Sequence, residues 1–314
     1  MKIIYLFLFA IAASVSVFAQ TTQRTIAVTI DDLPVVSTRR DLNNRTEITK
    51  KLLGHIRKAK IPAIGFVNEK KLYRNEARDE KEVDLLRMWA DAGLELGNHT
   101  YSHRSLNNIP LAEYQSDLLK GESATRELLG RKGKKLRFFR HPYLQTGRSM
   151  EVKSQFDAFL KQHGYTIAPI TFDNADYIFS RAYDIAFDKG DRELMKKVGD
   201  AYVPYMEAKL DYWERQSLKL LGREMSQTLL IHANFINSDY MDDLAAMFKR
   251  RGYRFVTLEA ALKDEAYRLP DTYVGPAGIS WLHRWARSKG RNFIVPNEVK
   301  VPEFVLKLSG FESE

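Results

Sequence analysis

The stretch TIAVTIDDLP, residues 25–34, begins as an apolar, β-branched run and ends in two carboxylates. Such a run is typical of a short β-strand. Neighbouring side chains of a strand point to opposite sides, so Asp31 and Asp32 are not expected to bind one ion in the same way. The two carboxylates are therefore expected to divide the work of a site. A turn or a helix cap is the alternative for an Asp-Asp pair before Leu33 and Pro34.

Six further β-rich runs follow along the chain, and longer segments with helical spacing of apolar residues separate them. These runs are PAIGFV (62–67), LELGN (94–98), LRFFR (136–140), YTIAPI (165–170), TLLIHA (228–233) and YRFVTL (253–258). This βα alternation predicts the α/β class with a parallel sheet. Seven strands indicate a distorted seven-stranded (β/α) barrel, although a doubly wound open sheet has the same local signature.

Polar strings lie at or just beyond the ends of several of these runs, as the two aspartates do for the first. They are HTYSH (99–103), RHPY (140–143), DNADY (173–177) and LIH (230–232). Barrel enzymes build their sites at the C-terminal ends of successive strands. An open sheet gathers site residues mainly at its switch point. The strings therefore favour the barrel.

Histidines are the strongest metal-ligand candidates, because the chain has no cysteine and any metal must be held by nitrogen and oxygen. A single helical turn would place His99 and His103 on one side, which suits two ligands of one cation. A polar surface or core pair is the alternative. His232 ends an apolar strand, where a satisfied core histidine is the common alternative to a catalytic one.

Together, and in this order, the five strings resemble the motifs of the polysaccharide deacetylase family, also called carbohydrate esterase family four, over residues 25–262. The resemblance is to the chitooligosaccharide- and peptidoglycan-deacetylase-like domain. It implies that Asp32, His99 and His103 hold one divalent ion. Two histidines and a carboxylate leave an open position for water, which is a catalytic arrangement with zinc as the default metal. Cobalt, nickel, iron or manganese could substitute.

The resemblance also implies catalytic roles. Asp31 is the expected general base, and Arg140 pairs with it. His232 is the expected general acid, and Asp176 is its orienting carboxylate. The backbone N–H of Tyr143 would help to hold the oxyanion. A surface salt bridge followed by a proline turn is the alternative for the RHPY string.

Three positions depart from the family pattern. Tyr177 stands where tryptophan is usual, and Leu33 and Leu144 replace common glycines. These changes are expected to leave the chemistry intact and to alter the walls of the substrate groove. None of the other four histidines is expected to be a ligand; these are His55, His141, His163 and His283.

The chain divides into three predicted parts. Residues 1–19 read as a signal peptide, with an uncleaved anchor as the alternative, so export to the periplasm or the medium is expected. Residues 20–269 form the predicted barrel, with a helical insertion at about 178–226. Aromatic residues in that insertion are expected to pack as core rather than to stack on sugars. Residues 270–314 form a C-terminal extension.

Composition and net charge indicate which classes of binding partner suit the chain. The chain has 314 residues and a net charge of +9, which would favour an anionic envelope or polymer surface. Its basic clusters are interpreted as solvated faces rather than as a nucleic-acid site. Outside the N-terminus no segment could cross a membrane, so no stable membrane insertion is expected. The oligomeric state stays open.

The sequence thus predicts an exported hydrolase that removes N-acetyl, or alternatively O-acetyl, groups from a cell-envelope or environmental glycan. It would act on carbon–nitrogen bonds other than peptide bonds, and its substrate would be an acetylated polysaccharide or oligosaccharide. Two alternatives remain: a hydrolase of small cyclic amides on the same fold, and a noncatalytic glycan-binding protein.

Overall fold

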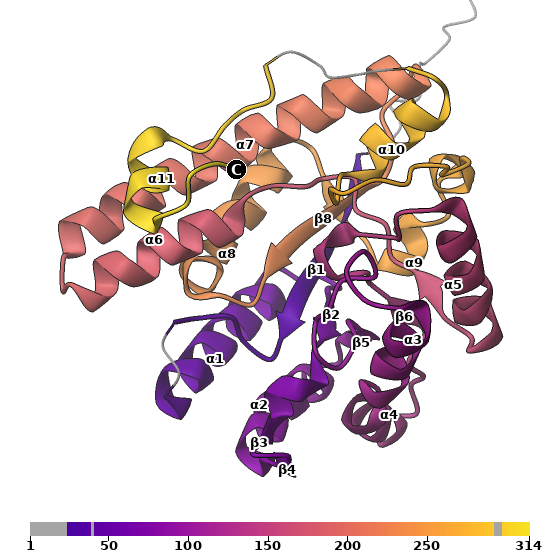
Figure 1. Ribbon diagram of the computed structural model, residues 1–314. Helices are drawn as coiled ribbons and strands as arrows, with labels where there is room; N and C mark the ends of the chain where they lie inside the picture. The colour runs from indigo at the N-terminus through magenta and orange to yellow at the C-terminus, as the bar shows by residue number, and fades with distance from the viewer. Residues whose placement is uncertain (1–23, 39–40, 292–296) are drawn as a thin grey trace, which may run out of the picture.

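The computed structural model describes residues 24–38, 41–291 and 297–314 (Figure 1). The predicted signal peptide, residues 1–19, lies outside these residues. Within the described ranges, none of the helices combines the length and the apolar character needed to cross a membrane.

One parallel sheet forms the centre of the molecule, with strand order β7-β6-β5-β2-β1-β8 and β9 beside β1. Each of its strands lies within one of the seven predicted runs, except that β1 extends beyond the end of its run and β8 begins one residue before its run. The strands are β1 Thr25–Leu33, β2 Ile64–Val67, β5 Glu95–Asn98, β6 Phe138–Phe139, β7 Thr166–Ile167, β8 Gln227–His232 and β9 Arg254–Phe255. A small antiparallel pair, β3 Tyr73–Arg74 and β4 Ala77–Arg78, was not predicted.

The sheet curls so that its two ends approach each other. Phe172, which follows β7, bridges Leu229 of β8 in the parallel sense, and the backbone N–H of Thr171 donates to the Thr228 carbonyl at 3.2 Å. Residues just beyond one edge strand therefore pair with the other edge strand. This curled parallel sheet confirms the predicted distorted (β/α) barrel.

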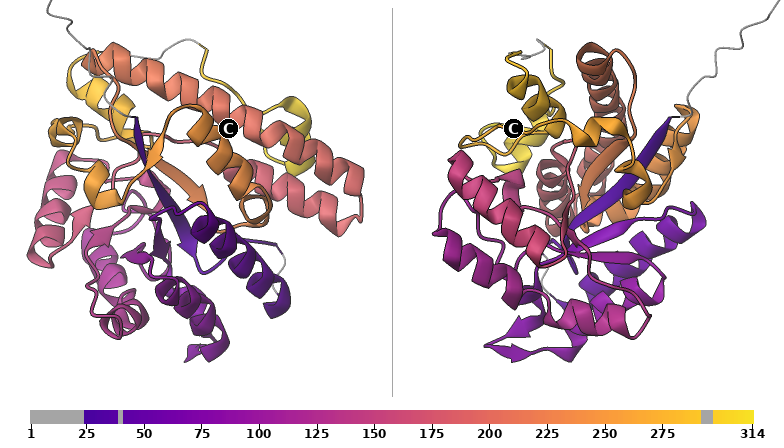
Figure 2. Two further views of the ribbon diagram at one scale, coloured as in Figure 1. Left: turned by 180° about the vertical axis from the view of Figure 1, so that it is seen from behind. Right: turned by 90° about the vertical axis from the view of Figure 1, so that its right-hand side faces the viewer.

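Helices follow most strands and cover the outside of the sheet (Figure 2). The longer ones are α1 Leu42–Lys58, α2 Glu80–Asp91, α3 Leu111–Lys120, α4 Ser123–Gly130, α5 Met150–Gln162, α6 Asp176–Asp188, α7 Arg192–Leu221, α8 Phe235–Arg250, α10 Trp281–Ser288 and α11 Glu303–Ser309. Shorter turns are η1 Glu69–Leu72, η2 Pro142–Leu144, α9 Leu258–Ala261 and η3 Glu265–Arg268.

Local sequence explains where the longest helix begins and ends. The side chain of Asp191 caps α7 by accepting from the backbone N–H of Leu194, and Gly222 ends it in the left-handed conformation that favours glycine. The helix supplies buried aromatic residues to the core, as predicted for the insertion. Helix α6 packs against α7, and α11 packs against α6 (Figure 1).

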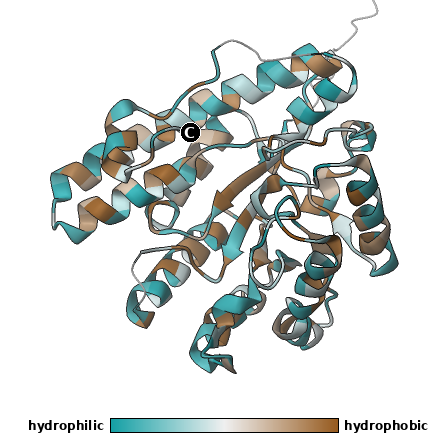
Figure 3. Cartoon of the chain, in the orientation of Figure 1, coloured by the Kyte–Doolittle hydropathy of each residue, from teal (hydrophilic) through white to brown (hydrophobic). Residues whose placement is uncertain are grey.

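Two apolar layers surround the sheet. The larger cluster lies between the sheet and the helices. Figure 3 shows that apolar (brown) and polar (teal) segments alternate along the helices. The smaller cluster is made of strand residues and α9, and its buried members are Ala27, Ile64, Phe66, Phe138, Ala168, Leu258 and Ala261. Burial of apolar residues on both faces is typical of parallel strands. It leaves the strand ends as the positions for polar side chains.

Candidate active site

The end of β1 departs from regular strand geometry at the aspartate pair. The register with β2 shifts between Ile30 and Leu33, and Asp32 has a positive φ of 67°. A left-handed residue breaks the alternation of side chains. Asp31 and Asp32 both line one cavity, so the expectation that they point to opposite sides is wrong.

His99 and His103 lie on the loop after β5, not on the predicted helical turn. Thr100 and His103 both have positive φ, 64° and 56°, which no helix allows. The Asn98 side chain accepts from the Thr100 backbone N–H at 2.7 Å, and the Thr100 hydroxyl accepts from the His103 backbone N–H at 3.0 Å. Local hydrogen bonds of this kind replace the helix and still bring the two rings together, with centroids 4.8 Å apart.

The two imidazoles meet Asp32 at distances that fit a divalent cation. The Nε2 atoms of His99 and His103 lie 3.5 Å and 3.4 Å from Asp32 Oδ1. Two ligands about 2.0–2.1 Å from a tetrahedral ion would lie about 3.3 Å apart. Asp32 Oδ1 is also buried without a hydrogen-bond partner among the described residues. The three side chains therefore form a donor set suited to one metal ion.

Neighbouring groups hold these donors in the required protonation states. The Arg140 carbonyl oxygen lies 2.8 Å from His99 Nδ1, so the Nδ1–H form donates there and leaves the Nε2 lone pair free. Burial lowers the pKa values of His99 and His103, which favours the neutral ligand form. Burial opposes the charged form of Asp32, but Lys71 and the two histidines lower its pKa. Lys71, which the sequence analysis missed, donates to the Asp32 carbonyl at 2.6 Å.

Asp31 and Arg140 form a buried pair beside this donor set. Arg140 Nη1 lies 3.3 Å from Asp31 Oδ2, and its Nη2 donates to the Thr29 hydroxyl at 2.9 Å. Burial raises the pKa of Asp31 to about 6, while Arg140 and His232 act in the opposite direction. Asp31 Oδ1 has no hydrogen-bond partner among the described residues, so one carboxylate oxygen remains available to a ligand.

His232 at the end of β8 is fixed by Asp176, the first residue of α6. Asp176 Oδ1 accepts from His232 Nδ1 at 2.7 Å, and Oδ2 accepts from the His232 backbone N–H at 2.8 Å. The side chains of Asn234 and Asn237 also donate to Oδ2. Burial lowers the pKa of His232, but Asp176 outweighs it and raises that pKa to about 9. The Nδ1 bond leaves Nε2 as the nitrogen available to the cavity.

Tyr143 lies on the rim of the site, next to His103. Its backbone is left-handed, with φ 56° and ψ 15°, and its side chain is among the exposed aromatic residues. The ring stands 4.5 Å from that of His103, between centroids. The structure thus places Tyr143 beside the three metal-donor residues.

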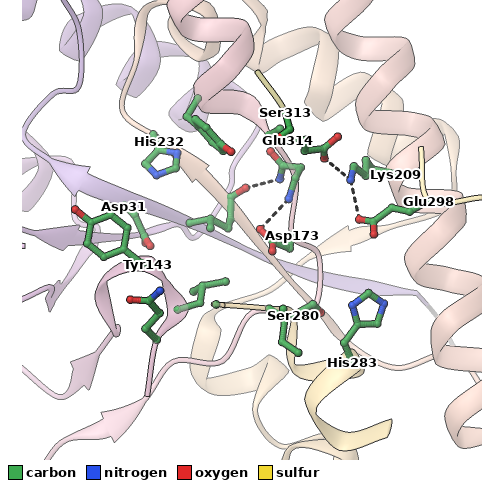
Figure 4. Close-up of a pocket in the computed structure, with 18 of the residues that line it drawn as sticks. Asp31, Tyr143, Asp173, Lys209, His232, Ser280, His283, Glu298, Ser313 and Glu314 are labelled. Carbon is green, nitrogen blue, oxygen red and sulfur yellow. Dashed lines mark hydrogen bonds and ion pairs between the residues drawn. The ribbon is translucent and has the colours of Figure 1, made fainter. Parts of the chain in front are cut away.

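A cavity of about 910 Å³ is lined by Asp31, Tyr143, His232 and the three metal-donor residues, and it extends well beyond them. Arg140 and Asp176 do not line it: both are fully buried behind the residues that they orient. In Figure 4, Asp31, Tyr143 and His232 lie on one side, and a second polar group lies opposite. The residues of that side to which the sequence analysis assigned no site role are Asp173, Lys209, Trp213, Ser280, His283, Glu298 and Glu314. A weak signal existed for two of them, because Lys209 and Trp213 are four residues apart and share a face of α7.

The three residues that depart from the family pattern occupy different environments in the structure. Leu144 and Tyr177 line the cavity, as expected. Leu33 does not: it is fully buried and packs against Gly65, where a Cβ would lie 2.1 Å from its Cδ1. The expectation that Leu33 shapes the groove is therefore wrong. His141 and His283, which had no expected role, also line the cavity.

Comparisons with known proteins identify relatives of this chain. A family model described as polysaccharide deacetylase matches residues 19–168. A chitin deacetylase from Colletotrichum lindemuthianum is 28% identical over 241 residues, which are 76% of this chain and 79% of the relative. The structure of the chitin deacetylase from that fungus has a TM-score of 0.50 and 23% identity, covering 78% of this chain and 89% of that chain.

A second solved structure shares the fold. It is a mutant of a carbohydrate esterase family four pseudoenzyme, with a TM-score of 0.50 and 15% identity over 77% of this chain and 68% of that chain. The wild-type pseudoenzyme comes from Bacillus anthracis. At this identity the likeness to the solved structures supports the fold alone. The evidence for the family comes from the sequence motifs and the sequence comparisons. Together, the motifs, the family model and the sequence relative support membership of the polysaccharide deacetylase family.

Proposed function

We propose that the protein is an exported, metal-dependent deacetylase that hydrolyses N-acetyl groups of a glycan. One observation carries the proposal: the donor set of Asp32, His99 and His103 opens into the same cavity as Asp31 and His232. A metal donor set, a carboxylate with a free oxygen and an oriented histidine are the parts that hydrolytic acyl transfer requires. Export rests on the predicted signal peptide, and zinc is the proposed metal.

A bound zinc ion supplies Lewis-acid polarisation of the acetyl carbonyl and of the attacking water. Asp31 takes the proton of that water through its free oxygen. Arg140 holds the other oxygen in place and compensates the buried charge. The distances support this division of labour: Asp32 Oδ1 lies within 3.5 Å of Nε2 of both histidines. Asp31 Oδ2 lies 3.3 Å from Arg140 Nη1 and 3.7 Å from His99 Nε2.

His232 protonates the leaving group in the proposed mechanism. Asp176 fixes the imidazole through Nδ1, so that Nε2 delivers the proton to the departing amine. The Tyr143 backbone N–H is proposed to donate to the oxyanion. An amide leaves as an amine only when it is protonated, and this requirement makes the histidine essential for N-acetyl substrates.

Replacing His232 with alanine is expected to slow amide hydrolysis by about 10²–10⁴-fold, the usual contribution of a general acid. Loss on an activated acetyl ester should be much smaller, because that leaving group departs without a proton. Acetate release from an N-acetylated sugar and from 4-nitrophenyl acetate measures the two losses. Equal losses on both substrates would contradict the assigned role of His232.

A carbohydrate substrate follows from family membership, and the glycan itself remains to be identified. The alternative substrates are small cyclic amides, and the alternative role is noncatalytic glycan binding. Incubation of the zinc-loaded protein with acetylated chitooligosaccharides, acetylated xylan and a cyclic imide separates them. The proposal predicts acetate from a glycan. Turnover of the imide with no acetate from any glycan would favour the first alternative, and glycan binding without turnover the second.

A further inference from the structure

The catalytic cavity has a second end, about which the proposed mechanism says nothing. Lys209 on α7 is 2% exposed and binds two carboxylates, with Nζ 2.8 Å from Glu298 Oε1 and 2.5 Å from Glu314 Oε1. Tyr205 donates to the same Glu314 oxygen at 2.8 Å. The Val301 backbone N–H donates to Glu314 Oε2 at 3.1 Å. The bonds to Lys209 and Tyr205 tie the tail, residues 297–314, to the insertion helix, and the Val301 bond holds Glu314 within the tail.

The earlier part of the C-terminal extension, residues 275–280, closes another side of the cavity. The Gln145 side chain donates to the Pro276 carbonyl at 2.7 Å, and Asn107 donates to the Gly275 carbonyl at 2.9 Å. Gly278 packs so closely that a Cβ there would lie 1.7 Å from the Tyr143 carbonyl oxygen. This segment is therefore fitted to the loop that carries the catalytic rim.

The two parts of the extension thus wall one cavity, from the Tyr143 rim to the Lys209 end (Figure 4). Its volume of about 910 Å³ lies within the range of about 300–1,000 Å³ that is typical of sites for small molecules. An internal residue of a long glycan would need free passage for chain on both sides of the reacting sugar. The anchored tail lines the cavity on the Lys209 side, where it would obstruct that passage.

The space between the two ends offers polar contacts to a sugar. Asp173 lines the cavity between the catalytic side and Lys209, and only its Oδ1 has a hydrogen-bond partner among the described residues, the Asn174 backbone N–H at 3.0 Å. Its second oxygen can accept from a sugar hydroxyl. Trp213, whose indole N–H donates to the Asp173 carbonyl, lines the same stretch.

We infer that the C-terminal extension makes this deacetylase selective for short acetylated oligosaccharides and chain ends over internal residues of a polymer. The inference rests on the proposed function and names its substrate class. The bond between Lys209 and the two tail glutamates is the selecting element, because it fixes the wall that a longer chain would meet.

The test compares acetate release from N-acetylglucosamine oligomers of increasing length with release from soluble glycol chitin, using the full zinc-loaded chain. We expect kcat/KM per acetyl group to rise over the first few sugars, then to level off, and to be at least about tenfold lower on the polymer, a difference the size of one or two good hydrogen bonds. Lys209→Met should raise the polymer-to-oligomer ratio by about the same factor. Glu314→Gln should raise it less, because Glu298 still binds Lys209.

Lys196→Met is the matched control, since Lys196 lies on the same helix, is exposed and, within the part of the chain that the structure describes, forms an ion pair only with the nearby Asp200. It should leave the ratio unchanged. Equal rates on oligomers and polymer, or a ratio unaffected by Lys209→Met and Glu314→Gln, would overturn the inference and leave the deacetylase proposal intact.

Failure of the proposed function gives a different pattern: no acetate from any substrate. In that case, binding of each oligomer to the zinc-loaded Asp31→Asn variant tests the length selectivity separately from catalysis. The change in tryptophan fluorescence on adding each oligomer measures this binding. Saturable binding of short oligomers that glycol chitin fails to displace would support the inference. Displacement by the polymer at equal sugar concentration, or no binding of any oligomer, would refute it.

Discussion

Asp31→Asn is expected to lower kcat for acetate release by at least about 100-fold while the protein keeps its metal, because a general base contributes about 10²–10⁴-fold. The asparagine side chain has nearly the same shape and retains an oxygen for the Arg140 guanidinium, which lies 3.3 Å away. It cannot take a proton from water. Steady-state acetate release and bound zinc per chain, measured on one preparation, check both parts of the prediction.

Stability is the necessary control for this variant. Arg140 is fully buried, and a buried charge that loses its partner typically costs about 3–5 kcal/mol of unfolding free energy. Thermal unfolding and circular dichroism establish that the variant is folded at the assay temperature. Asp200→Asn, which changes an exposed carboxylate on α7, is the matched substitution and should retain full activity. Wild-type turnover by folded, zinc-loaded Asp31→Asn would show that another group is the base.

Metal binding itself should collapse when one of the three donors is removed. Asp32→Ala and His103→Ala are each expected to weaken zinc binding by more than about 100-fold, since even the loss of an outer-shell partner costs about 10–100-fold. His103→Ala is the easier of the two variants to interpret, because the His103 side chain is 25% exposed and its truncation disturbs little packing. Equilibrium dialysis against zinc measures the change.

The control for the metal ligands uses another histidine. His163 is exposed at the C-terminal end of α5, and His163→Ala should bind zinc as the wild type does. If His103→Ala retains wild-type zinc affinity, the three residues do not hold the ion, and the proposed centre is misplaced.

The sequence predicted the fold because each strand carries its own local signal. A buried strand such as β1 is a continuous β-branched run, and the polar residue that ends it marks the rim of the barrel. Local backbone geometry at the strand ends is harder to predict from the sequence than the strands themselves. Neither the left-handed Asp32 nor the left-handed Thr100 has glycine's signature, so the bulge and the histidine loop were read as a regular strand and a helical turn.

The far wall of the cavity was beyond sequence reasoning for a different reason. Lys209, Glu298 and Glu314 come together only through the packing of the tail on the insertion, across as many as 105 positions of sequence (314 − 209). A buried lysine in an amphipathic helix looks like a surface residue until its partners are known. The roles of the catalytic residues stay predictions, whereas the presence of Asp31, Tyr143 and His232 in one cavity with the three metal donors is a property of the structure.

Acetate release during zinc titration of the metal-stripped protein tests the central claim most directly. With a short acetylated chitooligosaccharide as substrate, activity should be absent in the chelated protein, rise linearly with added zinc and level off at one equivalent per chain. Full activity in the presence of a strong chelator, or no acetate at any zinc level, would contradict the account of this protein as a metal-dependent deacetylase.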